Sequence, residues 1–416
     1  MQNVLAILLA GGAGERLSPL TLNTAKPAVP FGGTYRIIDF TLSNCLNSGV
    51  RKIFVLTQYK SLELTRHVRE GWSIFRSELN EFIEVIPPMK RVHEDWYLGT
   101  ADAVYQNIES ILIEAPELVL ILSGDHIYKM DYQEMMAWHK SHRADVTIAT
   151  IQIPPEEAGR FGVASIDSRY RIHGFEEQPK HGNPIRSAFN PDMISASMGI
   201  YVFNTRVLLE ALREDAADPN SAHDFGRNLL PKWTSRADVM AYDFRDLNAK
   251  TVRYWRDVGT LDAYYEANMD LVSVSPEFNL YDERWPIRTA LYQQPPAKFV
   301  FASEGRRMGV ALDSIVSPGA IISGGRVIHS VLSPGVRVNS YSVIDSSILL
   351  TKAVVGRFSR IQRAIVPANV VLPESTVIGF DLESDRAKGY TITESGIVVV
   401  PPPSGITDSV LTAAQG

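Results

Sequence analysis

Aliphatic residues recur every 17 residues near the C-terminal end of this chain, and this repeat restricts the fold more than any other feature. Each repeat has three aliphatic positions spaced six residues apart. The four sets are Ile315, Ile321, Val327; Leu332, Val338, Ile344; Leu349, Val355, Ile361; and Val366, Leu372, Ile378. A parallel β-helix needs three such corners per coil, because each coil stacks its inward residues on those of the coil before. One corner shorter by a residue explains a period of 17 and not 18.

A generic β-rich sandwich is the alternative interpretation of this segment. It also spaces aliphatic residues, but irregularly, so several of the twelve positions should then be polar or turn residues. All twelve are aliphatic. The spacing therefore predicts a β-helix of hexapeptide repeats over residues 307–385, followed by a C-terminal tail at 386–416. We expect the part of the tail from Pro401-Pro402-Pro403 onward to be weakly ordered.

Residues 1–275 have a different pattern, in which short apolar runs alternate with amphipathic segments. This pattern is typical of βα units around a mainly parallel sheet. A helix is expected at Asp39–Ser48, ended by Gly49. The expected strands are Val4–Leu9, Lys52–Thr57, Leu118–Leu122 and Val146–Thr150. Residues 276–306 are expected to be a linker that packs against another surface, because it carries Phe278 and Trp285.

Composition excludes several classes of protein. A length of 416 residues predicts two or three domains. The 41 Lys and Arg against 47 Asp and Glu give a net charge of −6, which does not attract nucleic acid or anionic lipid. The single Cys45 forms no internal disulfide and indicates a reducing compartment. No apolar run is long enough to span a membrane. We therefore expect a cytoplasmic protein with no membrane or nucleic-acid partner.

A glycine-rich loop follows the first expected strand and reads Leu9-Ala10-Gly11-Gly12-Ala13-Gly14-Glu15-Arg16-Leu17. It is not the dinucleotide fingerprint, because Leu17 occupies the third glycine position, and no GK[ST] follows to make a P-loop. Backbone N–H groups of such a loop can approach phosphate oxygens, and Arg16 and Lys26 add cations. This combination suits a nucleoside triphosphate. The alternative is a glycine turn beside two surface cations.

Two aspartates occur in polar turns that follow apolar segments. Asp125 comes after Leu118–Leu122, and Asp257 comes after Trp255. Open α/β sheets place ligand groups in such turns. Two carboxylates from separate loops would suit one Mg²⁺, a hard cation that takes oxygen ligands and substrate phosphates together. The residues alone leave open that each aspartate is an N-cap or a turn residue.

Motifs from residue 9 to about 300 resemble the sugar-nucleotide pyrophosphorylases, whose signature is a GGxGxRL loop followed by Lys-Pro. Among these, the chain is most similar to the bacterial ADP-glucose pyrophosphorylases. The matching stretches are Ala25–Val29, Arg36–Asp39, Leu42–Asn44, Thr57–Tyr59, Trp96–Tyr97, Gly99–Val104, Ser123–Tyr128, Ala196–Phe203, His223–Gly226 and Trp255–Thr260. The resemblance implies a Rossmann-like α/β nucleotidyltransferase domain with a mixed, mainly parallel sheet, followed by a left-handed parallel β-helix.

The resemblance also implies an activity, in which ATP and glucose 1-phosphate give ADP-glucose and pyrophosphate for glycogen synthesis. It implies a homotetramer or heterotetramer that responds to anionic allosteric effectors, with Arg36 in the effector site. Mg²⁺ would be the cofactor, held by Asp125 and Asp257. The implied catalytic residues are Arg16, Lys26 and Asp125. The implied ATP-binding residues are Leu9, Gly11, Gly12, Gly14, Arg16, Gly99 and Thr100. The implied sugar-phosphate residues are Tyr97, Gly162, Glu177, Gln178 and Ser197.

Three positions depart from the family pattern. Gln178 stands where the family has a lysine that binds the sugar phosphate, and losing such a charge-assisted contact costs about 1.5–3 kcal/mol. Lys180 follows two residues later, where an extended segment would point it elsewhere. Residues Pro87–Arg91, with Met89 and Lys90, replace glutamines that help to bind adenine, and Asn23 replaces a basic residue that responds to activators.

These departures keep a second hypothesis open. The family includes regulatory subunits that retain the fold and have lost catalysis, so the chain is expected to be a working or weakened enzyme or such a subunit. An acyltransferase is a third hypothesis, because hexapeptide β-helices are common in that class. It would need a histidine beside the coils. The coil region offers only His329, and the glycine loop would have no role.

Overall fold

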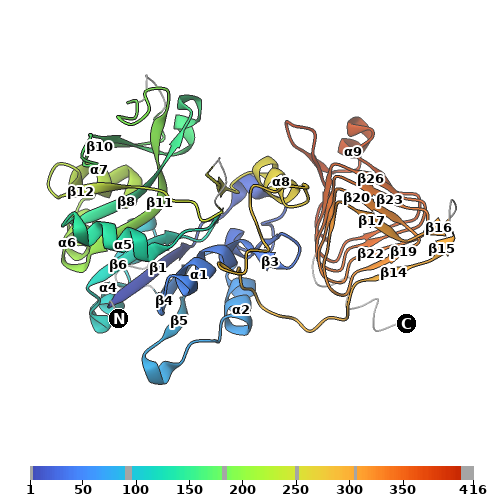
Figure 1. The fold of residues 1–416 in the computed structure, drawn as a ribbon, viewed down its shortest axis with the longest axis horizontal. Helices are drawn as coiled ribbons and strands as arrows, with labels where there is room; N and C mark the ends of the chain where they lie inside the picture. The colour runs from blue at the N-terminus through green and yellow to red at the C-terminus, as the bar shows by residue number, and fades with distance from the viewer. Residues whose placement is uncertain (1–2, 90–95, 180–184, 249–252, 304–306, 404–416) are drawn as a thin grey trace. The chain divides into compact units, whose positions relative to one another are not determined.

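The computed structural model describes residues 3–89, 96–179, 185–248, 253–303 and 307–403. The chain forms two units (Figure 1). Unit 1 comprises Met1–Gly12, Ile38–Trp255 and Glu283–Ile287, and unit 2 comprises Ala13–Ile37, Arg256–Asp282 and Arg288–Gly416. The segment between the first strand and Ile37 therefore belongs to the unit that contains the β-helix.

A nine-stranded sheet forms the centre of unit 1, in the order β10-β9-β11-β6-β1-β4-β5, with β8 paired to β11 and β12 paired to β8. Strands β6, β1, β4 and β5 are parallel, whereas β11 is antiparallel to both β6 and β8. This confirms the predicted mixed α/β sheet. The bounds are β1 Val4–Ala10, β4 Lys52–Thr57, β5 Phe82–Ile86, β6 Leu118–Ser123, β8 Val146–Ile153, β9 Gly162–Ile166, β10 Ile172–Glu177, β11 Ile194–Asn204 and β12 Val239–Asp243.

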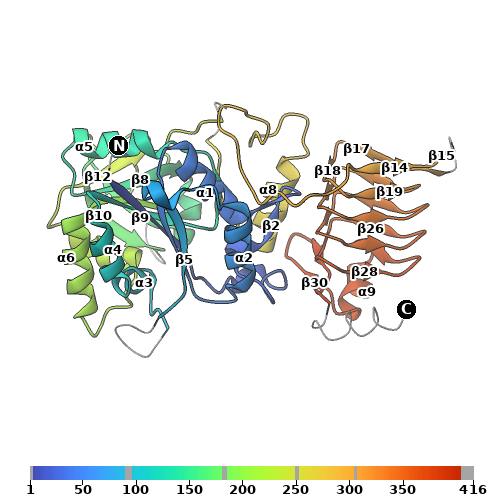
Figure 2. The same cartoon turned by 90° about the horizontal axis from the view of Figure 1, so that it is seen from below.

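Helices cover both faces of this sheet (Figure 2). Helices α3, α4, α6 and α7 share one apolar core with alternate residues of the strands, and α1 and α5 lie on the opposite side. Gly49 has a φ of 71° and follows α1, as predicted. No helix among the described residues is both long and apolar enough to cross a membrane. The bounds are α1 Ile37–Asn47, α2 Leu62–Gly71, α3 Thr100–Tyr105, α4 Ile108–Glu114, α5 Tyr132–Ser141, α6 Thr205–Ala216 and α7 Leu230–Trp233.

A parallel β-helix forms most of unit 2, and its stacked coils are visible in Figure 2. Three sheets build it. The first contains β14 Lys298–Val300, β19 Ile321–Ser323, β22 Arg337–Val338, β25 Val354–Val355 and β28 Val371–Leu372. The second contains β17 Val310–Leu312, β20 Arg326–Ile328, β23 Val343–Asp345, β26 Arg360–Gln362 and β29 Val377–Ile378. The third contains β18 Ile315–Val316, β21 Val331–Leu332, β24 Ile348–Leu349, β27 Ala364–Val366, β31 Val398–Val399 and β30 Thr391–Ile392.

The first coil differs from the prediction in register. Val316 and Ile322 pair with the inward residues of the next coil, so the prediction of Ile315 and Ile321 at these corners was wrong by one residue. Ile322 is fully buried, whereas Ile321 is only partly buried. The other ten predicted positions are buried and keep the 17-residue step.

A glycine pair explains the shift. The corner from Ile322 to Val327 spans five residues, where the next coil uses six, and Gly324–Gly325 lies within it. Gly324 adopts a φ of 74°, and a methyl group on Gly325 would lie 2.7 Å from Val338 Cγ1. A corner this tight requires glycine, because a side chain would not fit against the next coil.

The strands that pair into the β-helix extend beyond the expected range of 307–385 at both ends. β14 lies within the segment expected to be a linker, and β31 lies within the segment expected to be a tail; α9 (Leu382–Ala387) precedes β30. Other parts of residues 276–306 are packed, since Phe278 is fully buried and Trp285 Nε1 donates to Asn44 Oδ1 at 2.8 Å. The hairpin β15 (Ala302–Ser303) and β16 (Arg307–Met308) follows β14.

The third sheet is buried on both of its faces. Its outward residues Val331, Ile348 and Ile365 are as inaccessible as the inward ones. The other segments of unit 2 bond to the β-helix, since the Tyr265 hydroxyl of α8 (Leu261–Asp270) donates to the Ser346 carbonyl at 2.6 Å. The short hairpin of β2 (Pro30–Phe31) and β3 (Tyr35–Arg36) belongs to the same unit.

The stacked corners predict a position-dependent loss of stability. Ile361 is fully buried between the corner residues of two neighbouring coils, so Ile361→Ala should lower the free energy of unfolding by about 2–5 kcal/mol. Val371 is 69% exposed, and Val371→Ala should change the free energy of unfolding by no more than about 0.5 kcal/mol. Denaturant unfolding of both variants checks this, and equal losses would show that the corner does not stabilise the domain.

Candidate active site

Residues of the family motifs follow the carboxyl ends of three parallel strands in unit 1. Gly11 directly follows β1, and Gln58 directly follows β4. Asp125 is the second residue after β6. A methyl group on Gly11 would lie 3.2 Å from Gln58 Cβ, and the Gly124 amide donates to the Leu9 carbonyl at 3.1 Å. This edge is where open α/β sheets bind their ligands, and small residues here let a ligand approach the backbone closely.

Asp125 is held by its neighbours in the same turn. The Ser123 hydroxyl donates to the Asp125 carboxylate. His126 Nε2 lies 3.4 Å from Asp125 Oδ1, and the His126 ring packs edge-on against Trp255 with centroids 5.0 Å apart. His126 thus packs against Trp255 and faces the Asp125 carboxylate.

Glu177, at the end of β10, lies in a pocket shaped by two glycines. A methyl group on Gly162 would lie 2.6 Å from Glu177 Oε2, and one on Gly226 would overlap the same atom. Burial and, second to it, the neighbouring charge of Asp224 raise the pKa of Glu177 to about 7, against the opposing effect of Arg227. The site therefore holds a carboxyl that titrates near neutral pH and accepts close contact only from small groups.

Gly99 and Thr100 are tied to the segment that contains Asp224. A side chain on Gly99 would overlap the His223 carbonyl. The Thr100 hydroxyl donates to Asp224 Oδ2 at 3.0 Å and accepts from the Phe225 amide at 3.0 Å. Thr100 therefore fixes one loop against the other. Its predicted contact with ATP stays a prediction.

The remaining predicted sugar-phosphate residues differ in their surroundings. Tyr97 is buried in the apolar core, and its hydroxyl accepts from Asn107 Nδ2 at 3.1 Å, which favours a packing role. Ser197 lies at an irregularity of β11, where its hydroxyl accepts from the amide two residues on. Gln178 adopts a φ of 49°, and its backbone N–H donates to the Phe161 carbonyl at 3.1 Å.

Three charged residues converge on Gly259 in unit 2. Lys26 Nζ lies 3.1 Å from Asp257 Oδ1, and both side chains are largely buried. A methyl group on Gly259 would lie 2.9 Å from Asp257 Oδ2 and 3.2 Å from Arg16 Nη2. Two cations and a carboxylate therefore surround one glycine, which is an arrangement suited to a charged phosphate ligand.

The backbone before Lys26 is fixed by a second glycine. Gly14 adopts a φ of 66°, and a methyl group on it would lie 3.0 Å from Lys26 Cβ. The Thr21 hydroxyl donates to the Gly14 carbonyl at 2.8 Å. Arg36 donates to the Ala28 carbonyl, in the turn that contains Lys26. The predicted effector role of Arg36 stays a prediction.

The structure adds residues that the sequence analysis quoted in motifs without assigning a role. These are Gln58, Asp224, Gly226 and Gly259. Each lies in a motif that was recognised, but only the fold reveals what its neighbours are. Asp125 and Asp257 belong to different units, so their shared metal ion stays a prediction. Lys90, Arg91 and Lys180 lie outside the described residues.

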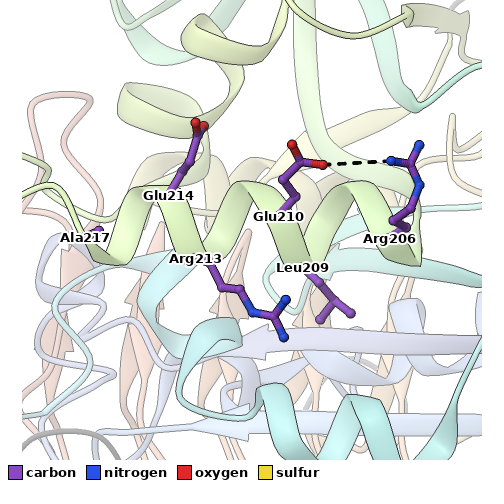
Figure 3. A pocket seen from close by; sticks show the side chains of 6 residues that line it. All are labelled: Arg206, Leu209, Glu210, Arg213, Glu214 and Ala217. Atoms are coloured by element: carbon purple, nitrogen blue, oxygen red, sulfur yellow. Dashed lines mark ion pairs between the residues drawn. The ribbon is translucent and has the colours of Figure 1, made fainter.

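A separate hollow borders α6 and is shown in Figure 3. Its lining contains an ion pair between Arg206 Nη1 and Glu210 Oε2 at 4.0 Å. The lining residues are Arg206, Leu209, Glu210, Arg213, Glu214 and Ala217, and none of them is a predicted site residue.

The sheet with its glycine loop, followed by a hexapeptide β-helix, defines a two-domain nucleotidyltransferase. Residues 5–274 match the family model of the nucleotidyl transferases. Residues 295–400 match the model of the GlmU-like C-terminal hexapeptide domain. The chain therefore belongs to the nucleotidyl transferase family and is an enzyme of that class.

Known relatives narrow this class. A glucose-1-phosphate adenylyltransferase of Koribacter versatilis (strain Ellin345) is 62% identical over 96% of this chain and 95% of its own length. Enzymes of the same name from Rhodopirellula baltica and Methylococcus capsulatus are 54% and 50% identical, covering 99% and 96% of this chain and 93% and 94% of their own lengths. The chain belongs to the glucose-1-phosphate adenylyltransferase family, as its motifs predicted.

The surroundings of Glu177 predict a pH dependence of stability. Because its pKa is raised to about 7 from 4.5, the folded protein binds an extra proton between these values, and stability is lost as the pH rises through 7. Glu177→Gln should remove this loss, so the variant should gain about 1–2 kcal/mol relative to the wild type between pH 5 and pH 8.

The neighbouring Glu176 provides the control for this experiment, because it is exposed on the same strand. Thermal or denaturant unfolding at both pH values should give no such pH-dependent gain for Glu176→Gln. A Glu177→Gln gain that is the same at pH 5 and pH 8 would show that the Glu177 carboxyl is not titrating in this range.

Proposed function

We propose that this protein makes ADP-glucose and pyrophosphate from ATP and glucose 1-phosphate, as the entry to glycogen synthesis. The observation that carries the proposal is the convergence of Arg16, Lys26 and Asp257 on Gly259. Two cations at this position suit the triphosphate. The 62% identity to a glucose-1-phosphate adenylyltransferase supports the choice of substrates.

The residues present fit the Mg²⁺ that this reaction would use. Asp125 and Asp257 each offer a carboxylate, the oxygen ligand that Mg²⁺ takes in proteins. The Asp125 side chain is partly exposed, at 29%, whereas that of Asp257 is largely buried, at 17%, beside Lys26. We propose that they hold the ion, which when bound would neutralise charge on the phosphates.

The proposed reaction needs no general base. A phosphate oxygen of glucose 1-phosphate, already ionised at neutral pH, forms a bond to the α-phosphorus of ATP, and the bond to pyrophosphate breaks in line. Arg16 and Lys26 would bind the triphosphate and stabilise its charge, while the Gly11–Gly12 backbone approaches the nucleotide. Catalysis then depends on position and charge, which the fixed backbone at Gly14 supplies.

The sugar would bind beside Glu177. Its carboxylate would accept hydrogen bonds from glucose hydroxyls, and the absence of side chains at Gly162 and Gly226 leaves this carboxylate closely surrounded by backbone. Gln178 replaces a cation next to this group, which supports the alternative of a weakened enzyme or a regulatory subunit. The intact Arg16, Lys26 and Asp125 favour the active enzyme.

The assembly and its regulation are proposals that rest on the family. The protein would form a homotetramer or heterotetramer that binds anionic effectors, with Arg36 among the ligands, as the resemblance of its motifs implies. A cytoplasmic location accords with the single Cys45.

Pyrophosphate release by the purified chain with Mg²⁺ tests the proposed function. The panel should pair ATP and the other nucleoside triphosphates with glucose 1-phosphate and glucosamine 1-phosphate. ATP with glucose 1-phosphate should give the highest rate, and Asp125→Asn should abolish it. Asp131→Asn is the matched control, because Asp131 only caps α5 and asparagine caps equally well. Activity retained in Asp125→Asn would contradict the assignment of Asp125 as a metal ligand. If the wild type released no pyrophosphate with any substrate pair, the hypothesis of a regulatory subunit would be favoured.

Restoring the missing cation should strengthen sugar-phosphate binding. Gln178→Lys should lower the KM for glucose 1-phosphate about tenfold, because a charge-assisted contact replaces a neutral one, with little change in the KM for ATP. The exposed Gln293→Lys makes the same charge change elsewhere and should alter neither constant. An unchanged KM in an active Gln178→Lys enzyme would show that residue 178 does not face the phosphate.

A further inference from the structure

We infer that Tyr264 and Asn268, on one face of α8, are positioning residues that hold Lys26 at the nucleotide phosphates. The inference rests on the proposed function, in which Lys26 binds the triphosphate. Neither residue belongs to the predicted site, and neither touches the Lys26 ammonium group in the contacts described above. Their role is exerted on the backbone that follows Lys26.

Two hydrogen bonds tie this backbone to α8, and a third within the helix holds one of the two side chains. The Tyr264 hydroxyl donates to the Pro30 carbonyl at 2.6 Å. Asn268 Oδ1 accepts from the Gly32 amide at 2.9 Å, and Asn268 Nδ2 donates to the Tyr264 carbonyl at 2.8 Å. Tyr264 and Asn268 are both completely buried, and the Tyr264 ring packs edge-on against Phe31. Buried polar bonds of this kind specify one arrangement, because an unpaired group there is costly.

These bonds close a ring that contains the Lys26–Asp257 ion pair. Asp257 lies three residues before Thr260, whose hydroxyl caps α8 by accepting from the Ala263 amide at 3.2 Å. Lys26 lies four residues before Pro30. Helix α8 therefore fixes both ends of the ion pair, Asp257 through its N-terminus and Lys26 through Tyr264 and Asn268. Loss of the Pro30 bond would loosen Lys26 while Asp257 stays in place.

The next residue of the helix supplies a matched control. Tyr265 is also buried, and its hydroxyl also donates to a backbone carbonyl at 2.6 Å, but this carbonyl belongs to Ser346 in the β-helix. Tyr264→Phe and Tyr265→Phe therefore remove the same kind of bond from neighbouring positions. Only the first removes a bond to the segment that contains Lys26.

The experiment compares both variants in the full-length protein. Tyr264→Phe should lower kcat/KM for ATP about tenfold, because small displacements of a positioning group have large effects on rate, with the KM for glucose 1-phosphate unchanged. Tyr265→Phe should lower kcat/KM for ATP less than twofold, despite a similar fall in melting temperature. Equal effects of the two variants on kcat/KM would overturn the inference.

Two further measurements separate positioning from general destabilisation. In the Lys26→Ala background, Tyr264→Phe should weaken ATP binding by less than a further twofold, because it acts through Lys26; a full additional effect would contradict the inference. Hydrogen exchange of amides 28–32 should accelerate in Tyr264→Phe and not in Tyr265→Phe. This comparison decides the anchoring even if the wild type has no activity, an outcome that would refute the proposed function alone.

Discussion

The ion pair between Lys26 and Asp257 joins two segments that are 231 residues apart in the sequence. Both charges are largely buried, and a charge removed from water is stable only beside an opposite charge. The pair is possible only because Gly259 leaves room for the Asp257 carboxylate and the Arg16 guanidinium. The placement of Arg16 and Lys26, the cations proposed to bind the triphosphate, thus depends on one buried charge pair and one missing side chain.

The β-helix takes part in this arrangement through its third sheet, which is buried on both faces. The outward residues Val331, Ile348 and Ile365 of this sheet are inaccessible, and α8 bonds through Tyr265 to Ser346, in the turn before β24 of the sheet. The same helix bonds to the backbone after Lys26 through Tyr264. The β-helix and the segment that contains Lys26 therefore share one helix, whose two adjacent tyrosines bond to different neighbours.

The charged groups around Gly259 in unit 2 and around Glu177 in unit 1 have different surroundings. Around Gly259 opposite charges lie together, whereas Glu177 is buried beside the like charge of Asp224, which raises its pKa to about 7. A triphosphate brings negative charge to the first group, and sugar hydroxyls bring hydrogen-bond donors to the second. The two environments match the two proposed substrates.

The sequence alone determined the fold class and most of the candidate site. Aliphatic residues that recur every 17 residues specify a β-helix, because only stacked coils need them. Apolar runs that end in glycines specify the sheet edge that contains Asp125. The register of the first coil could not be predicted from the sequence. The corner at Gly324–Gly325 is one residue shorter than that of the next coil, and only the contact between the two coils reveals this. Nor could the sequence reveal Tyr264, Gly226 or Gly259. Their roles come from atoms distant in the sequence, and only the tertiary structure decides which distant atoms meet.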